Sequence, residues 1–177
     1  MIEIHKKWPD IIRGFGELKC YKEWKGEKLN LDKLSKYWSL CEYAAEYNLP
    51  IFVHFSFYDD YAVKRFSNLL NKFPSVKFVL CHCGMDKETD NDFCYHSVIK
   101  LMNDYPNLWV DATWEALNYF SDNPLKLTNM DRSRIILGSD MNKLAMNEDN
   151  YKKEWDKIHN LDVLIKSDKN IKKLFNL

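Results

Sequence analysis

Short apolar runs alternate with longer amphipathic stretches along most of the chain. The short runs are rich in β-branched and aromatic residues, as buried strands are. Five strands are predicted in this way, over residues 11–18, 51–55, 76–81, 108–112 and 134–138. Three of them follow a proline (Pro50, Pro74 or Pro106), which cannot continue a helix and so ends the segment before the strand. This alternation is typical of βαβ units around a parallel sheet.

The segments between the strands carry apolar residues at helical spacing. Helices are predicted over residues 31–45, 63–73 and 95–102, and two closing helices over residues 151–158 and 162–175. Residues 118–129 are less periodic, and Pro124 is expected to interrupt a helix there. Because no low-complexity linker divides the chain, its 177 residues are expected to fold as a single domain.

Composition narrows the class of protein. The 26 basic and 26 acidic residues cancel, and no basic block of the kind that binds a phosphate backbone occurs, so nucleic acid is not an expected partner. The apolar runs fall far short of the roughly 20 residues that span a bilayer. The N-terminus lacks the order of a signal peptide, so a cytoplasmic protein without a membrane partner is expected. Five cysteines, an odd number, then indicate free thiols.

Acidic and histidine residues recur at one position of the predicted units. Each lies at or just beyond the C-terminal end of a strand: Glu17, His54, His82, Asp111 and Asp140. Their spacings of 37, 28, 29 and 29 residues compare with roughly 31 residues per unit in a (β/α)8 barrel, whose active site is built at those strand ends. An open doubly wound sheet also binds ligands at strand C-termini, although in one crevice rather than a ring of side chains.

These residue types suit a metal site. Imidazole and carboxylate are ligands that zinc accepts, and a catalytic site needs about three of them and an open position for water. Glu17, His54 and Asp140 are candidate ligands, Asp140 is also a candidate base, and His82 is a candidate for polarising a substrate oxygen. Structural interpretations stand beside these. A histidine after a strand, such as His54, is as often a hydrogen-bonded structural residue as a metal ligand. Asp111 is expected to cap or bond a loop, and Asp140 alone could cap a helix.

Five segments resemble a known family. They are residues 14–18 (GFGEL), 50–54 (PIFVH), 78–84 (FVLCHCG), 107–111 (NLWVD) and 134–140 (RIILGSD). In order and spacing they resemble successive strands of the amidohydrolase-related metal-dependent hydrolases of the amidohydrolase 2 type. The closing residues 170–175 (NIKKLF) are similar to the final helix of that family, so the resemblance extends from about Pro9 to the C-terminal region.

The resemblance implies a partial (β/α)8 TIM barrel that contains the fourth to eighth strands. His54 would then be a metal ligand, and Asp140 would bind metal and shuttle a proton. His82 would hold a second metal or bind the substrate carbonyl, and Glu17 would be a bridging or additional ligand. The implied cofactor is a divalent metal, zinc first. The implied reactions are hydrolysis of C–N bonds, decarboxylation of aromatic acids, or hydration and hydrolysis of related carbonyl compounds, all with small-molecule substrates.

One departure from the family pattern affects the functional expectation. The first strand of the family ends in a His-x-His pair, which this sequence lacks. Three units, on the order of 90 residues, would precede the first strand recognised here. Weak metal binding and slow or absent hydrolysis by this chain are therefore expected. The alternative is an inactive half-barrel that serves as a binding or assembly module, and its open sheet edges predict a homo-oligomer.

Three further features have competing interpretations. Lys19 could bind an anionic group of the substrate and Trp114 could contact the substrate, but a surface lysine and a packed aromatic explain them equally well. Cys81-x-Cys83 and Cys94-x-His96 could form a structural zinc site, although zinc ligand pairs usually have wider spacing. If residues 81–83 are a strand, both cysteines face away from His82, and they are then expected to pack outside the barrel.

Overall fold

The computed structural model describes residues 1–19, 23–24, 27–28, 37–138, 140 and 148–177. Its main sheet has five parallel strands, each paired with the next along the chain: β1 (Phe15–Lys19), β4 (Ile51–His54), β5 (Phe78–Leu80), β6 (Leu108–Ala112) and β7 (Ile135–Leu137). Strands in chain order with helices between them form a partial α/β barrel, as predicted. A separate two-stranded antiparallel sheet, β2 (Glu23–Trp24) and β3 (Glu27–Lys28), was not predicted.

Helices follow most strands. They are α1 (Ile2–Lys7), α2 (Trp38–Glu46), α3 (Asp60–Lys72), α4 (Asn91–Asp104), α5 (Trp114–Asp122), α6 (Glu148–Ile165) and α7 (Ser167–Phe175). Three short 3₁₀ segments are η2 (Cys81–Gly84), η3 (Pro124–Asn129) and η4 (Arg132–Arg134). The starts of α3 and α4 are fixed by Asp59 and Asp90, whose carboxylates accept backbone N–H bonds of the first turn. No helix in these described parts of the chain is long and apolar enough to cross a membrane.

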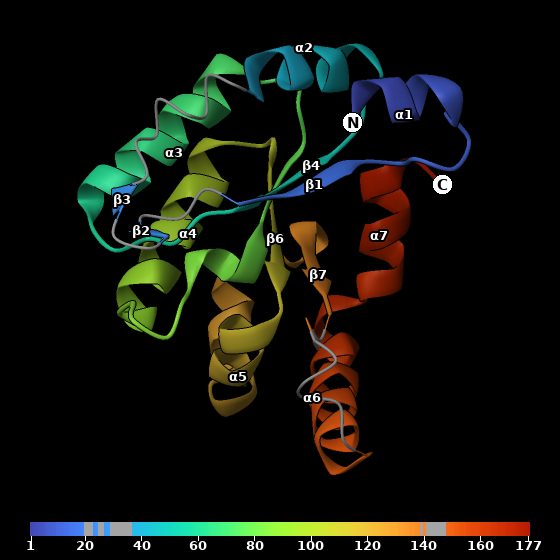
Figure 1. Ribbon diagram of the computed structural model, residues 1–177. Coiled ribbons are helices and arrows are strands. Elements are labelled where there is room, and N and C mark those ends of the chain that lie inside the picture. Colours follow the sequence, from blue (N-terminus) through green and yellow to red (C-terminus); the bar gives the residue numbers. More distant parts are fainter. Residues whose placement is uncertain (20–22, 25–26, 29–36, 139, 141–147) are drawn as a thin grey trace.

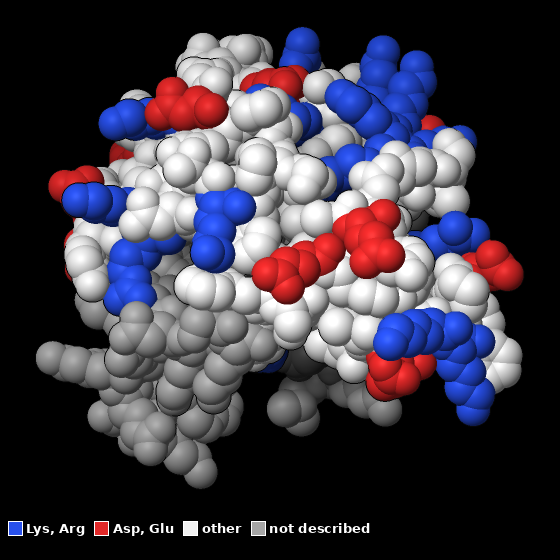
Figure 2. All heavy atoms as spheres, turned by 90° about the horizontal axis from the view of Figure 1, so that it is seen from above, with Lys and Arg blue, Asp and Glu red and all other residues white. Residues whose placement is uncertain are grey.

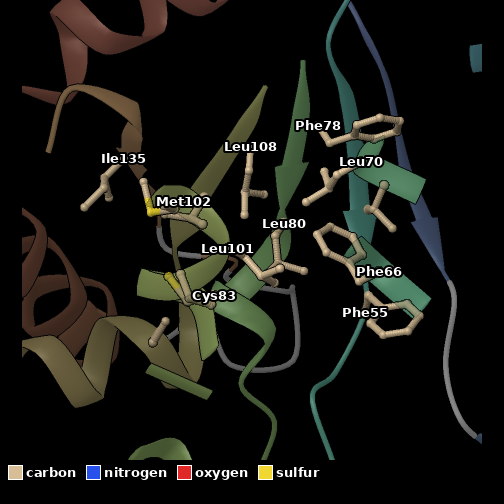
Figure 3. Close-up of a cluster of buried hydrophobic side chains, with 14 of the residues drawn as sticks. Phe55, Phe66, Leu70, Phe78, Leu80, Cys83, Leu101, Met102, Leu108 and Ile135 are labelled. Carbon is tan, nitrogen blue, oxygen red and sulfur yellow. The ribbon is translucent and has the colours of Figure 1, made fainter. Parts of the chain in front are cut away.

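One face of the sheet carries the main core. Side chains from β4 to β7 pack there against helices α2 to α6. The close-up in Figure 3 shows part of this core, with Phe78, Leu80 and Leu108 of the sheet lying among Phe66, Leu70, Leu101 and Met102 of α3 and α4. Alternate residues of each strand point to this face, so the remaining ones point to the opposite face. We call the opposite face the inner face, because it corresponds to the interior of a closed barrel.

The inner face is covered at one end by α7. Val79, Trp109 and Ile136 form a second cluster with Leu174 of α7. The amide of Asn170 donates to the carbonyls of Arg132 and Ile135 beside the start of β7, and Lys77, just before β5, donates to the carbonyl of Leu174. In Figure 1, α7 lies beside β7 and away from α3 and α4. It therefore closes the N-terminal end of the inner face and leaves the C-terminal ends of the strands uncovered by this helix.

The predicted elements are confirmed in type, with shifted ends. Helix α2 begins at Trp38, and residues 31–36 of the predicted helix lie outside the described residues. The interruption at Pro124 is confirmed, since α5 ends at Asp122 and Pro124 opens η3. The break between the closing helices was predicted wrongly. Helix α6 runs on to Ile165 and the chain turns at Lys166, which has a left-handed backbone.

Helix α1 was not predicted, since it has too few residues for an apolar period. It is anchored by His5, a buried histidine whose Nδ1 lies 2.8 Å from the hydroxyl of Tyr43 on α2. The ring of His5 also packs edge-to-face against Phe15 and Tyr43. These contacts connect the start of the chain to β1 and α2.

Charges of both signs are interspersed on the face of the molecule seen from above in Figure 2. This matches the equal numbers of basic and acidic residues in the sequence. A mixed distribution of this kind produces no large field of one sign over the described part of that face.

Candidate metal centre

Three potential metal ligands meet at the C-terminal end of the inner face. Glu17 lies on β1, His54 is the last residue of β4, and His82 lies in the turn that follows β5. One ligand atom from each of the three lies within 4.8 Å of the other two. Neighbouring parallel strands place their C-terminal ends side by side, which explains how residues 37 and 28 positions apart converge.

His54 is poised to be neutral. Its side chain is buried, and its Nδ1 forms a hydrogen bond with Oε1 of Glu17. Burial lowers the pKa of His54, and the bond to Glu17 opposes this effect only in part. A neutral imidazole at neutral pH is the form that binds a metal ion.

His82 lies between two carboxylates. Its Nε2 is 3.8 Å from Oε1 of Glu17 and 3.8 Å from Oδ2 of Asp140. The ring packs edge-to-face against His54, with 4.7 Å between centroids. Asp140 follows β7 with a left-handed backbone, and its side chain is about half exposed (49%). The site therefore has a buried side, formed by the two imidazoles, and a side open to solvent, where Asp140 lies.

A buried polar network contacts His82 at its backbone N–H and at Nδ1, away from the Nε2 atom that faces Glu17 and Asp140. Oδ1 of Asp111 accepts the backbone N–H of His82 at 2.6 Å and the hydroxyl of Thr113 at 2.7 Å. Oγ1 of Thr113 lies 2.6 Å from Nδ1 of His82. Burial raises the pKa of Asp111, and its hydrogen bonds from Thr113 and His82 oppose that rise. The expectation that Asp111 bonds a loop is confirmed, and the loop is the turn that carries His82.

The two predicted substrate contacts differ in position. The Trp114 ring packs edge-to-face against His82, with 5.5 Å between centroids, and the ammonium of Lys87 lies 5.6 Å from the same indole. Lys19 is the last residue of β1 and pairs with His54 in the sheet, but its side chain is exposed. The structure therefore brings Trp114 to the imidazoles and leaves Lys19 at the rim of the same sheet end.

The cysteines occupy two different environments. Cys83 and Cys94 belong to the main core, and their thiols donate to backbone carbonyls, as expected for packing residues. Cys81 was predicted wrongly, because residues 81–84 form a 3₁₀ turn rather than a strand and its thiol bonds to Asp111 beside the site. Burial raises the pKa of Cys81, so it is a thiol and not a thiolate. Within the described residues, the metal-ligand group contains Glu17, His54 and His82 and no cysteine.

Thr113 and the left-handed turns were missed by the sequence analysis. The signal for Thr113 was its position two residues after Asp111, directly beyond a buried strand. Left-handed backbones at His82, Cys83, Trp114 and Asp140 carry no sequence signal, since none of these residues is glycine.

Besides the geometry of the three potential metal ligands, the sequence as a whole matches a known protein family. The sequence profile described as amidohydrolase matches residues 12–176. The chain belongs to the amidohydrolase family. No curated protein sequence matches this amidohydrolase chain significantly.

Solved structures show the same fold at low identity. An amidohydrolase from Burkholderia multivorans with bound HEPES has a TM-score of 0.64 and 11% identity, with 99% of this chain and 69% of that chain covered. A second structure of an amidohydrolase from that organism, with bound zinc, has a TM-score of 0.59 and 11% identity, with 99% and 77% covered. Dihydroorotase from Campylobacter jejuni has a TM-score of 0.57 and 17% identity, with 99% and 62% covered. The chain thus spans less than two thirds of the dihydroorotase.

Proposed function

We propose that this amidohydrolase-family chain binds one divalent cation, zinc first, through Glu17, His54 and His82, and hydrolyses a C–N bond of a small molecule. The observation that carries the proposal is the convergence of two imidazoles and a carboxylate within 4.8 Å. Family membership and the resemblance to a dihydroorotase and to a zinc-bound amidohydrolase support it.

The donor set fits zinc. A catalytic zinc site uses about three nitrogen, oxygen or sulfur ligands from protein and keeps one position open. Two histidines and one glutamate meet that number, and the lowered pKa of His54 keeps one imidazole in its binding form. We therefore propose stable zinc binding in place of the weak binding expected from the missing His-x-His pair, and zinc titration decides between the two. When bound, the cation would act as a Lewis acid that lowers the pKa of a coordinated water to about 7.

Asp140 is proposed as the proton acceptor. Its carboxylate is about half exposed and lies 3.8 Å from Nε2 of His82, so water at the open side of the site can reach it. A carboxylate within reach of an attacking water can take its proton and pass it to a leaving amine. The sequence hypothesis gave Asp140 two roles, metal ligand and base, and gave His82 the role of a second-metal ligand or of a group that polarises the substrate. Because the close group contains His82 and not Asp140, we propose His82 as a metal ligand and Asp140 as the base only.

The substrate is proposed to lie over Trp114. This indole borders His82 and offers an apolar surface next to the polar site. Lys19, at the same end of β1, is proposed to attract an anionic group of the substrate at the rim. Both roles predict a larger effect on KM than on kcat, since neither residue is proposed to contact the reacting atoms.

A second candidate function rests on the sheet edges. β1 and β7 stand at the two ends of the five-stranded sheet, and each pairs with a single strand among the described residues. Open edges favour association. A half-barrel that serves as a binding or assembly module would form a defined oligomer in sedimentation and would bind no zinc, whereas the hydrolase requires zinc in either oligomeric state.

The test is zinc binding by the full chain after exhaustive dialysis with chelator, followed by calorimetric titration. His54→Ala and His82→Ala are compared with His159→Ala, an exposed histidine on α6 outside the site. We expect one zinc per chain, lost in both site variants and kept in His159→Ala. Turnover is then measured on amides, lactones and aromatic carboxylic acids. Equal zinc binding by wild type and His54→Ala would contradict the proposal.

A further inference from the structure

A single hydrogen-bonded chain leads from Asp111 through Thr113 to His82. All three residues are buried. Oδ1 of Asp111 and Oγ1 of Thr113 are 2.7 Å apart, and Oγ1 lies 2.6 Å from Nδ1 of His82. The same Oδ1 also accepts the backbone N–H of His82 at 2.6 Å. The carboxylate therefore holds both the backbone of His82 and the hydroxyl that touches its ring.

Donor and acceptor rules fix the direction of this chain. Oδ1 of Asp111 already accepts the backbone N–H of His82 and is also the acceptor for the hydroxyl of Thr113, so the hydroxyl proton of Thr113 points to Asp111. A hydroxyl has one proton, and Oγ1 can then only accept from the ring of His82. The proton of the neutral imidazole is therefore on Nδ1. The lone pair of Nε2 lies on the side of the ring that faces Glu17 and Asp140, each 3.8 Å away.

The surroundings hold the ring in this orientation. His82 has a left-handed backbone with φ 55°, and Trp114, the neighbour of Thr113, has one with φ 50°. The Trp114 ring and the His54 ring pack against the imidazole at 5.5 and 4.7 Å between centroids. These contacts fix the plane of the ring, and a ring flipped by 180° within that plane would lose the Thr113 bond.

We propose that Thr113 is a positioning residue that keeps His82 as the Nδ1–H tautomer, so that Nε2 is the atom that acts at the site. The consequence for metal binding rests on the proposed function, whereas the tautomer itself does not. Metal-binding histidines commonly donate their second N–H to a carboxylate or carbonyl, and loss of that partner typically costs 10–100-fold in affinity. Here a hydroxyl stands between the imidazole and the carboxylate.

The direct test is ¹⁵N NMR of the histidine rings in the full, metal-free chain at pH 8, with the His82 signals identified by their absence in His82→Gln. Wild type should show Nδ1 protonated and Nε2 unprotonated. Thr113→Val removes the acceptor and should move the proton toward Nε2, and Thr113→Ser should restore the wild-type pattern. Thr128→Val, at an exposed threonine bonded to the Leu125 carbonyl, is the matched control and should change nothing.

Two results would overturn the inference: an Nε2–H tautomer in the wild type, or an unchanged pattern in folded Thr113→Val. Should Thr113→Val fail to fold, Thr113→Ala removes the same hydroxyl with a smaller side chain, and an unchanged pattern in that variant would equally overturn the inference. Zinc titration separates the two proposals. We expect affinity to fall about 10–100-fold in Thr113→Val and to recover in Thr113→Ser. If wild type binds no zinc and Thr113→Val still shifts the ring proton of His82, the metal site is refuted and the inference is supported.

Discussion

The two ends of the inner face differ although the same strands build them. At the N-terminal end, Phe52 and Trp109 belong to an apolar layer that α7 covers. Two residues further along the same strands, His54 and Asp111 belong to the polar site. Because side chains alternate along a strand, a step of two residues stays on the same face. A strand of four or five residues thus serves the core at one end and the site at the other.

The two ends of the inner face also differ in backbone conformation. At the C-terminal end, the residues that follow β5, β6 and β7 include four non-glycine left-handed conformations: His82, Cys83, Trp114 and Asp140. Such conformations cost on the order of 1–3 kcal/mol each and persist only where surrounding contacts enforce them. For His82 and Cys83 these contacts are the hydrogen bond from the His82 backbone to Asp111 and the packing of Cys83 in the main core. The comparison indicates that the N-terminal end is an apolar layer, whereas the C-terminal end holds strained backbone that places the side chains of the site.

The largest expected effect is at the covered end. Leu174→Ala removes a fully buried side chain between α7 and the sheet. The free energy of unfolding should fall by about 2–5 kcal/mol in urea denaturation, while zinc affinity of the folded protein stays at the wild-type value. Leu177→Ala, at an exposed leucine, is the control. A loss of zinc binding without loss of stability in Leu174→Ala would contradict the division between the two ends.

Gly16→Ala should affect both ends together. Gly16 has φ +146°, and a Cβ there would lie 2.6 Å from the Cβ of Phe52 on the neighbouring strand. The clash would displace β1 from β4 and carry Glu17 away from His54. We expect a stability loss of more than about 1 kcal/mol and weaker zinc binding by calorimetry. Unchanged zinc affinity would show that Glu17 does not depend on the placement of β1.

Asn170→Ala should have a smaller, purely structural effect. The Asn170 amide donates to the carbonyls of Arg132, Ile135 and Ile165, and it is buried. Leaving these acceptors without that donor should cost about 1–3 kcal/mol in urea denaturation. Asn129→Ala, which removes one bond at an exposed asparagine, should cost less. Equal losses in the two variants would mean that the junction of α7 with β7 is not a special point of stability.

Much of the fold could be predicted from the sequence because its signals are local. Apolar runs, three of which follow a proline, located the five strands, and the spacing of about one βα unit placed Glu17, His54, His82 and Asp140 at one end of the sheet. Side-chain type then suggested a metal site. The strands and helices came from periodicity within each unit, and the position of the site came from the recurrence of acidic and histidine residues from one unit to the next.

The features that the sequence analysis missed depend on contacts between segments far apart in the chain. The hydrogen bond of Thr113 to His82 joins residues 31 positions apart, and the cover formed by α7 joins Lys77 to Leu174 across 97 positions. The turn at residues 81–84 has no glycine before Gly84, so its left-handed backbone is imposed by Asp111 and the surrounding core. Cys81 was assigned to the wrong side of the sheet because its strand was expected to end one residue later than it does.

The smallest expected effect is a dependence of stability on pH at the site end. Burial lowers the pKa of His54 in the folded, metal-free chain, whereas in the unfolded chain it titrates near 6.5. Below that pH the unfolded state binds a proton that the folded state does not, so the free energy of unfolding falls as pH is lowered. One group contributes a slope of at most about 1.4 kcal/mol per pH unit. Asp111, whose pKa is raised by burial, contributes in the opposite direction at lower pH.

The measurement that isolates His54 is a comparison of urea denaturation of wild type and His54→Gln between pH 8 and pH 5, with chelator present. Asp111 is common to both proteins, so its contribution cancels in the difference. Wild type should lose more stability than His54→Gln as the pH falls. His159→Gln, which changes a histidine outside the site, should follow the wild type. Parallel curves for wild type and His54→Gln would mean that burial of His54 carries no energetic penalty for its charged form, and the neutral imidazole proposed for zinc binding would lose its physical basis.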